Sequence, residues 1–280
     1  MSWMIVTDST SDLSMGMPTA EGVSFTVAPI RLIVEGREFI DDADLDVAEL
    51  LDAADAYNDS ASSACPSPED FVTAFRKADY SIAITITSTL SGSYNSAVVA
   101  KNMVLEETPE KKIHVFDSLS TCGALTLLAR KANELIAEGF NFEEVVAKLD
   151  AHNNWLQTVF SISSFNNLVK NGRVSKLEGF MANTLKIRAV GKATLQGELG
   201  VLHKLRGEEK AYSTLVDEMK NLKDPEEYGP VIVSHCFNLE GALVIKKMIE
   251  ERYPKAVVEI RETGGLNSFY AERSGIIIGY

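Results

Sequence analysis

The sequence contains little cysteine and too few basic residues to balance its acidic ones. Three cysteines, Cys65, Cys122 and Cys236, lie far apart in a chain of 280 residues. Their number and spacing argue against a disulfide framework or a zinc site and are typical of a reducing compartment. Twenty-seven Lys and Arg against 40 Asp and Glu give a formal net charge of −13. Such an acidic chain is a poor candidate for binding nucleic acid or an anionic membrane surface.

Long apolar runs and several familiar motifs are also missing. No stretch approaches the roughly 20 apolar residues that span a bilayer, and the segment MSWMIVTDSTSDL has no basic region before a long apolar core. We therefore expect a cytoplasmic protein without stable membrane insertion. The chain has no P-loop, no Gly-x-Gly-x-x-Gly, no Gly-x-Ser-x-Gly and no His-Glu-x-x-His. We expect neither a metal nor a cofactor, and these absences favour a binding protein over an enzyme.

Strand-like and helix-like segments alternate over the first half of the chain. Apolar patterning predicts strands at 3–7, 23–29, 81–87 and 112–117, and a pair of strands that turns at Gly36. Helical spacing predicts helices at 44–54, 68–78, 91–107 and 118–138, whereas 58–68 is predicted to be a loop. Strands separated by helices of this length predict parallel βαβ units. We therefore expect an α/β fold whose N-terminal domain, 1–150, contains a mainly parallel sheet.

The pattern changes beyond residue 141. Helices are predicted at 141–156, 208–222 and 239–253, and over 164–185 with an interruption near Gly172. A hairpin is predicted over 186–207 with its turn at Gln196-Gly197, and further strands at 158–163, 229–235, 256–262 and 273–280. This order predicts an α+β C-terminal domain over 151–280.

Hydroxyl-rich turns follow three of the predicted parallel strands, as DSTS, STLSG and DSLST. The carboxyl ends of parallel strands share one edge of a sheet, so these turns are expected to converge there. Ser91 and Gly92 stand at the start of a predicted helix, where free N–H groups suit a carboxylate or a phosphate. The simpler alternative is that Ser91 or Ser88 only caps the helix.

Other reactive side chains are weaker candidates. Ser63, in the segment SSACPSP, is expected to face Ser91 across the cleft, unless it lies in a solvated loop. Cys65 is a candidate nucleophile without an evident base. His235 follows a predicted strand, where a histidine is more often packed than catalytic. Arg173 and Arg206 each lie near a turn glycine and suggest a phosphate or partner contact, or only surface solubility.

Several of these segments occur in an order that resembles the DegV family. The resemblance is carried by IVTDSTSDL, SSACPSPEDF, ITITSTLSGSYNSA, VFDSLSTCGALTLLARKANELIAEG, LVKNGRVSK, KLRGEEKA and VIVSH, and covers nearly the whole chain. It implies two domains and a long-chain fatty acid in an apolar tunnel near their junction. The carboxylate would be held by Ser63, where the family usually has threonine, and by Ser91 with the Gly92 amide. The head-group surroundings would include Ser9, Thr10, Asp117 and Ser118.

The resemblance also implies a partner. Some members of the family present the bound acid to a separate kinase, which forms an acyl phosphate with ATP. The arginines that matter for that partner correspond to Arg173 and Arg206. Two departures stand out: Leu266-Asn267-Ser268 replaces the usual His-Thr-Gly, and Arg188-Ala189-Val190 replaces Lys-Pro-Ile. The resemblance thus implies a lipid-binding protein that does no catalysis of its own.

Two alternatives remain open at this point. One is a hydrolase or transferase that acts through Ser91, Cys65 or His235. The other is a small-polyol-binding protein, similar to the substrate subunit of dihydroxyacetone kinase, in which His235 would hold the ketone. Ligand size separates the fatty-acid hypothesis from the polyol hypothesis. An acyl chain of about 16 methylenes, each contributing roughly 0.8 kcal/mol when buried, requires a long apolar site.

Overall fold

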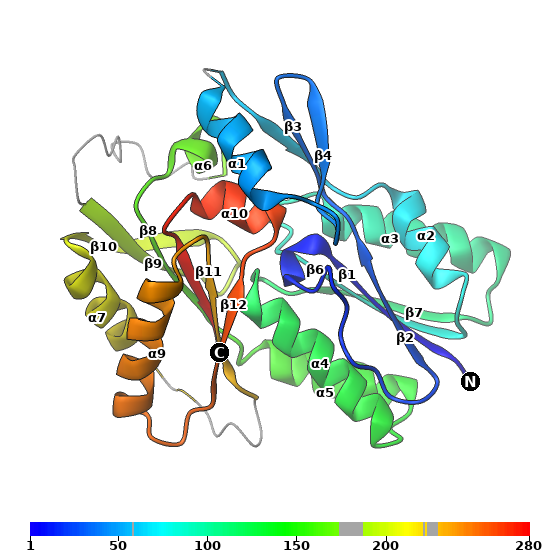
Figure 1. Ribbon diagram of the computed structural model, residues 1–280. Coiled ribbons are helices and arrows are strands. Elements are labelled where there is room, and N and C mark those ends of the chain that lie inside the picture. Colours follow the sequence, from blue (N-terminus) through cyan, green and yellow to red (C-terminus); the bar gives the residue numbers. More distant parts are fainter. Residues whose placement is uncertain (58, 174–186, 221, 223–228) are drawn as a thin grey trace.

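The computed structural model describes residues 1–57, 59–173, 187–220, 222 and 229–280. A parallel four-stranded sheet forms the N-terminal side, with the strand order β2-β1-β6-β7 (Figure 1). Its strands are β1 (Trp3–Asp8), β2 (Val23–Ala28), β6 (Tyr80–Thr85) and β7 (Lys112–Asp117). The predicted α/β architecture with a mainly parallel sheet is therefore confirmed.

Both faces of this sheet are covered by helices. Successive side chains of a strand point to opposite faces, so each strand packs against both helix layers. In β1, Trp3 and Ile5 pack with α4 (Gly123–Ala137) and α5 (Phe142–Asn153). Met4 and Val6 pack on the other side with α2 (Pro68–Phe75) and α3 (Ser93–Glu107). A sheet buried on both faces explains why these strands are almost continuously apolar.

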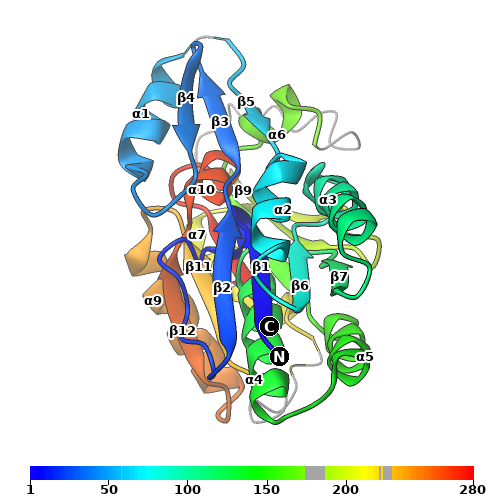
Figure 2. The same ribbon diagram turned by 90° about the vertical axis from the view of Figure 1, so that its right-hand side faces the viewer.

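A small antiparallel sheet stands beyond the carboxyl ends of the parallel strands (Figure 2). Its order is β4-β3-β5, with β3 at Arg31–Val34, β4 at Arg37–Ile40 and β5 at Ser62–Ala64. Helix α1 (Val47–Ala56) packs against it and is capped by Asp46. The prediction of a loop over 58–68 was wrong at β5, because three small residues pair through their backbone with β3, Ser63 opposite Leu32.

The C-terminal side is a mixed six-stranded sheet with the order β10-β9-β8-β13-β11-β12. Its strands are β8 (Thr158–Ile162), β9 (Ile187–Ala193), β10 (Leu199–Arg206), β11 (Val231–His235), β12 (Val258–Glu262) and β13 (Ile276–Gly279). Helices α7 (Glu208–Glu218) and α9 (Leu239–Arg252) cover one face. The predicted hairpin turning at Gln196-Gly197 is confirmed as β9 and β10. Helix α6 (Asn166–Lys170) lies in the predicted helical stretch 164–185, whose part beyond residue 173 lies outside the described residues.

Helix α4 contacts both large sheets, through β1 and β6 on one side and β11 and β13 on the other. Its start is tightly packed, because a Cβ on Gly123 would lie 2.8 Å from Ile232 Cβ. The helix begins at Gly123 and not at residue 118 as predicted, since Leu119 and Cys122 adopt positive φ angles.

The first sheet uses residues up to 117 and the second uses residues from 158 onwards. The predicted domain boundary near residue 150 falls within α5, which packs against α4 and β7.

One helix crosses back towards the N-terminal part. Helix α10 (Gly265–Ala271) contacts α1 and the short 3-10 helix η1 (Ser9–Ser11), although it follows β12 in the chain. Figure 1 shows it near the centre of the molecule, between the second sheet and the small sheet. No element was predicted at 265–271. This helix proves central to the site.

Candidate functional site

The three hydroxyl-rich turns meet at the carboxyl edge of the parallel sheet, as predicted. Asp8, at the end of β1, accepts a hydrogen bond from the Ile86 amide after β6 (2.8 Å). Asp117, at the end of β7, accepts one from the Ser88 amide (3.1 Å). The turns are thus bonded to one another.

The hydroxyls nearest these strand ends are occupied within the protein. Ser9 donates to Asp41 (2.8 Å), Thr10 donates to Asp8, and Ser118 donates to the Ser120 carbonyl. Ser9, Thr10, Asp117 and Ser118 do not line the pocket described below. They hold the surrounding loops in place, and their place around a head group stays a prediction.

A pocket of about 310 Å³ opens above this edge. Its apolar wall comes mainly from β8, β13, α10 and the loops that face them. Apolar lining residues include Phe160, Ile162, Leu168, Leu199, Ala271 and Ile277. Its polar lining consists of Ser63, Ser91, Thr121, Thr158, Asn267, Tyr270 and Arg173, with the Gly92 backbone and the Cys65 thiol beside them. The pocket is therefore largely apolar and carries a small number of hydroxyls, as small-molecule sites commonly do.

Ser63 and Ser91 line the same pocket from different segments. Ser63 lies on β5, and Ser91 directly precedes Gly92, the N-cap of α3. The two segments are in close contact, because a Cβ on Gly92 would lie 3.0 Å from Cys65 Sγ. Ser91 Oγ also accepts from the Ser93 amide at 3.2 Å, so it stabilises the first turn of α3 as well. The helix-capping role and a place in the pocket are therefore compatible.

Helix α10 reaches the pocket because two buried carboxylates hold its start. Asp41 accepts hydrogen bonds from the amides of Gly265 (2.7 Å) and Leu266 (2.9 Å). Asp12 accepts from the Gly264 amide (2.8 Å) and from the Asn267 side chain (2.7 Å). The two glycines allow this approach, since a Cβ on Gly265 would lie 2.8 Å from Asp41 Oδ1. Acceptors at a helix start satisfy its free N–H groups.

These carboxylates titrate unusually because they are buried. Burial raises the pKa of Asp12 to about 7 and the pKa of Asp8 to about 6, although several hydrogen bonds favour the charged form of each. Burial also raises the pKa of Asp41.

Leu266 and Asn267, two of the three residues that replace His-Thr-Gly, line the pocket, whereas Ser268 is buried and bonded to Thr263.

The two predicted partner arginines lie in different settings. Arg173 lines the pocket, and its Nε donates to the Leu90 carbonyl (3.3 Å), just before Ser91. Arg206 is the exposed last residue of β10 and does not line the pocket. Arg173 therefore lies at the pocket, whereas Arg206 lies on the exposed end of β10.

His235 lies outside the pocket. It is buried at the end of β11, burial lowers its pKa, and its Nδ1 accepts from the Asn238 amide (3.3 Å). None of the described histidines lines the pocket. Cys65 is the cysteine that lines the pocket. Cys122 and Cys236 are not among the lining residues, and burial raises the pKa of both thiols. Neither Ser91 nor Cys65 has a histidine base beside it there.

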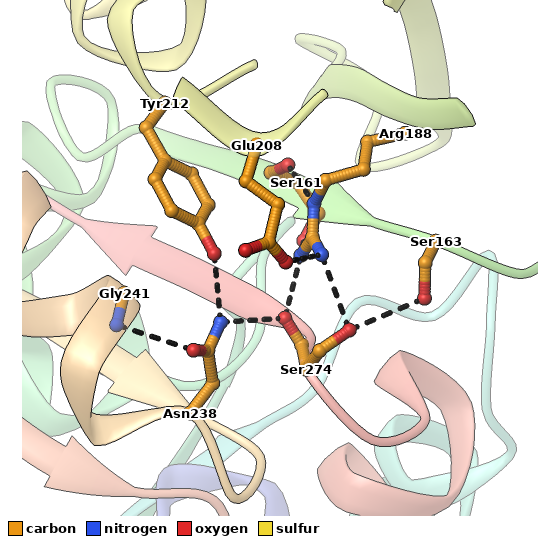
Figure 3. A network of polar contacts seen from close by, with 8 residues as sticks. All are labelled: Ser161, Ser163, Arg188, Glu208, Tyr212, Asn238, Gly241 and Ser274. Atoms are coloured by element: carbon orange, nitrogen blue, oxygen red, sulfur yellow. Dashed lines mark hydrogen bonds and ion pairs between the residues drawn. The ribbon is translucent and has the colours of Figure 1, made fainter. Parts of the chain in front are cut away.

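A network around Arg188, at the Lys-Pro-Ile position, was not foreseen from the sequence (Figure 3). The buried guanidinium donates to Glu208 (2.8 Å) and to Ser274 Oγ (3.1 Å), and its Nε donates to Ser161 Oγ. Asn238 joins the network through Tyr212 and the Ser274 carbonyl. The network ties the start of α7, two residues beyond Arg206, to the loop before β13.

The described helices include no membrane-spanning candidate, since none combines the necessary length with sufficient apolar character.

The class of protein is thus an α/β fold in which a parallel layer joins a mixed sheet, with a largely apolar pocket that carries several hydroxyls. The chain belongs to the DegV family: the family model described as "Uncharacterised protein, DegV family" matches residues 2–278. The resemblance seen in the sequence is thereby confirmed.

Known proteins resemble this chain over its whole length. A DegV domain-containing protein of Streptococcus pneumoniae serotype 4 is 40% identical over 280 residues, which cover 100% of this chain and 99% of that protein. The crystal structure of the Streptococcus pneumoniae Fatty Acid Kinase (Fak) B3 protein loaded with linoleic acid has a TM-score of 0.93, 39% identity, and coverage of 100% and 99% of the two chains. A DegV family protein from Eubacterium eligens loaded with heptadecanoic acid has a TM-score of 0.91, 33% identity, and 99% coverage of both chains.

Proposed function

We propose that this protein binds a long-chain fatty acid in the pocket between its two large sheets. The acyl chain lies along the apolar wall, and the carboxylate is held by the Ser63 and Ser91 hydroxyls and the Gly92 amide. The observation that carries the proposal is a largely apolar pocket with hydroxyls from β5 and the start of α3, in a chain that resembles two fatty-acid-loaded structures.

The energetics of such a ligand fit this site. Each buried methylene contributes roughly 0.8 kcal/mol, so a long acyl chain supplies most of the affinity. A carboxylate loses its water on binding and needs several donors in return. The N-terminal end of a helix of 15 residues, α3, supplies backbone N–H groups and a partial positive charge beside Ser91. The hydroxyls and the amide therefore orient the head group, and the apolar wall provides the binding energy.

We further propose that the protein presents this carboxylate to a separate kinase and does not itself catalyse a reaction. Phosphoryl transfer to a carboxylate requires a nucleotide and Mg²⁺, and the sequence carries no P-loop for a nucleotide. One of the similar structures is named as part of a fatty acid kinase. Arg206, exposed at the end of β10, is the residue that we assign to the kinase contact.

The test is to identify the lipid that co-purifies with the protein. Organic extraction and mass spectrometry are applied to the wild type, to Ser63→Ala/Ser91→Ala, and to the matched control Ser62→Ala/Ser88→Ala. Ser62 and Ser88 are exposed neighbours that do not line the pocket. We expect a stoichiometric fatty acid in the wild type and the control, and a clear loss in the pocket variant. A wild type that contains no fatty acid and binds none when it is added would overturn the proposal.

A further inference from the structure

Tyr270 brings a further hydroxyl to the polar part of the pocket. Its Oη lies 3.1 Å from Ser63 Oγ, and both residues line the pocket. Ser63 comes from the small sheet, whereas Tyr270 comes from α10, 207 residues further along the chain. The pair is therefore formed only when α10 is docked against the N-terminal part of the molecule.

We infer that the Tyr270 hydroxyl is a third hydroxyl of the head-group site, beside those of Ser63 and Ser91, and makes the site selective for a free carboxylate. This inference rests on the proposed fatty-acid-binding function and deepens it. Each hydroxyl of the pair has one proton, and the bond between them uses only one of these two. The remaining proton is available to a ligand acceptor in the pocket.

A carboxylate is the head group that gains most from this pair. When ionised it only accepts hydrogen bonds, and O–H donors to a charged oxygen bind roughly twice as strongly as neutral pairs do. An ester oxygen is a weaker acceptor, and an alcohol competes as a donor. Ser63 and Tyr270 together therefore favour the free acid over an ester or an alcohol of the same chain length.

The Tyr270 hydroxyl is also held in position before a ligand arrives. The first turn of α10 is bonded to Asp12 and Asp41, and Thr121 donates to Asn267 at 2.9 Å. The Tyr270 ring meets the buried Phe269 ring edge-on, with 5.0 Å between centroids. A donor fixed by its surroundings loses little freedom when it binds the ligand, which strengthens its effect.

The experiment compares Tyr270→Phe with Tyr94→Phe, a control on α3 that does not line the pocket. Dissociation constants are measured for a fatty acid, its methyl ester and the corresponding alcohol. We expect Tyr270→Phe to weaken binding of the acid about tenfold while the ester changes little, since a charge-assisted hydrogen bond is lost. Tyr94→Phe should match the wild type for all three ligands.

The outcomes separate this inference from the proposed function. A wild type that binds neither the acid nor the ester contradicts the proposed function. A wild type that binds both, with an unchanged acid-to-ester ratio in Tyr270→Phe, contradicts the inference alone. A second measurement does not depend on affinity: a fatty acid labelled with ¹³C at the carboxyl is titrated in the complex. Loss of a donor should raise the pKa of the bound acid in Tyr270→Phe, and an unchanged pKa would count against the inference.

Discussion

Thr89 donates a hydrogen bond from its hydroxyl to the Gly197 carbonyl at 2.7 Å, across 108 positions of sequence. Gly197 lies at the tip of the β9–β10 hairpin, and Thr89 lies in the loop that leads to Ser91. Leu199, two residues after the tip, lines the pocket. The contact therefore joins the second sheet to the loop that carries a proposed head-group hydroxyl.

We expect Gly197→Ala to disturb both stability and ligand binding. A Cβ there would lie 2.1 Å from Thr87 Oγ1 and 3.0 Å from Leu119 Cα, so the hairpin tip or the loop must move. Unfolding in urea should show a loss of more than about 2 kcal/mol, because backbone strain and a steric clash add together. Fatty-acid affinity should fall with it, as the Ser91 loop shifts.

Gly36→Ala is the matched control for this variant. Gly36 has the same φ of 78° at the turn between β3 and β4, but a Cβ there meets nothing within 4 Å. It should cost only the backbone strain, about 1–2 kcal/mol, and leave ligand affinity unchanged. If both variants bind fatty acid as the wild type does, the hairpin contact does not position the Ser91 loop.

The carboxylates below α10 predict a pH dependence of stability. Burial raises the pKa of Asp12 from 3.8 to about 7, so between these values the folded protein binds more protons than the unfolded chain. This contribution to stability is complete below about pH 4 and is lost as the pH rises towards 7. The slope for one such group is at most about 1.4 kcal/mol per pH unit. Asp41 and the Cys122 thiol face the same carboxyl, and Arg261 acts on it electrostatically.

Asp12→Asn should remove this part of the slope. The amide oxygen still accepts from Gly264 and Asn267, while the group can no longer ionise. Free energies of unfolding from urea titrations at pH 5, 6, 7 and 8 should therefore favour the variant progressively over the wild type as the pH rises. The exposed Asp44→Asn serves as the control and should follow the wild type. Parallel curves for wild type and Asp12→Asn would show that Asp12 is ionised throughout.

Much of the N-terminal layer could be predicted from sequence because its signals are local. The strands are apolar on both faces and alternate with helices, so the parallel sheet and the meeting of its turns follow from periodicity. The Ser-Gly at the start of α3 could be proposed as an anion site on the same local grounds. Ser63, in a second hydroxyl-rich segment, was expected to face Ser91, and the structure places both in one pocket.

Helix α10 and Tyr270 could not be predicted in this way. The segment that forms α10 is seven residues long and directly follows Gly264, which is a poor signal for a helix. It is stabilised by Asp12 and Asp41, more than 220 residues earlier in the chain. The same holds for β5, whose three small residues gain their strand conformation from pairing with β3. Long-range contacts decide these elements, and a local pattern does not contain them.

The Arg188 network predicts an asymmetry between two ion-pair partners. The Arg188 side chain is 4% exposed, whereas the Glu208 side chain is 59% exposed. Arg188→Leu should cost about 3 kcal/mol, because Ser161 and the Ser274 carbonyl lose their donors in a buried place. Glu208→Gln should cost less than about 1 kcal/mol, since an exposed partner contributes little. Urea unfolding measures both, and equal costs would mean that the ion pair itself dominates the network.

The last prediction concerns the surface proposed to meet the kinase. Arg206→Glu should leave the amount of bound fatty acid unchanged, because Arg206 does not line the pocket. It should lower the rate of acyl phosphate formation by a fatty acid kinase at least about tenfold, since an attractive charge at a protein contact becomes repulsive.

The control is Lys255→Glu, at an exposed residue that follows α9, because it changes the net charge equally. Equal rates for these two variants would exclude Arg206 from the contact, whereas a loss of lipid in Arg206→Glu would assign it to the ligand site. Arg173→Glu should differ from both by lowering the lipid content, because its side chain lines the pocket beside the Leu90 carbonyl.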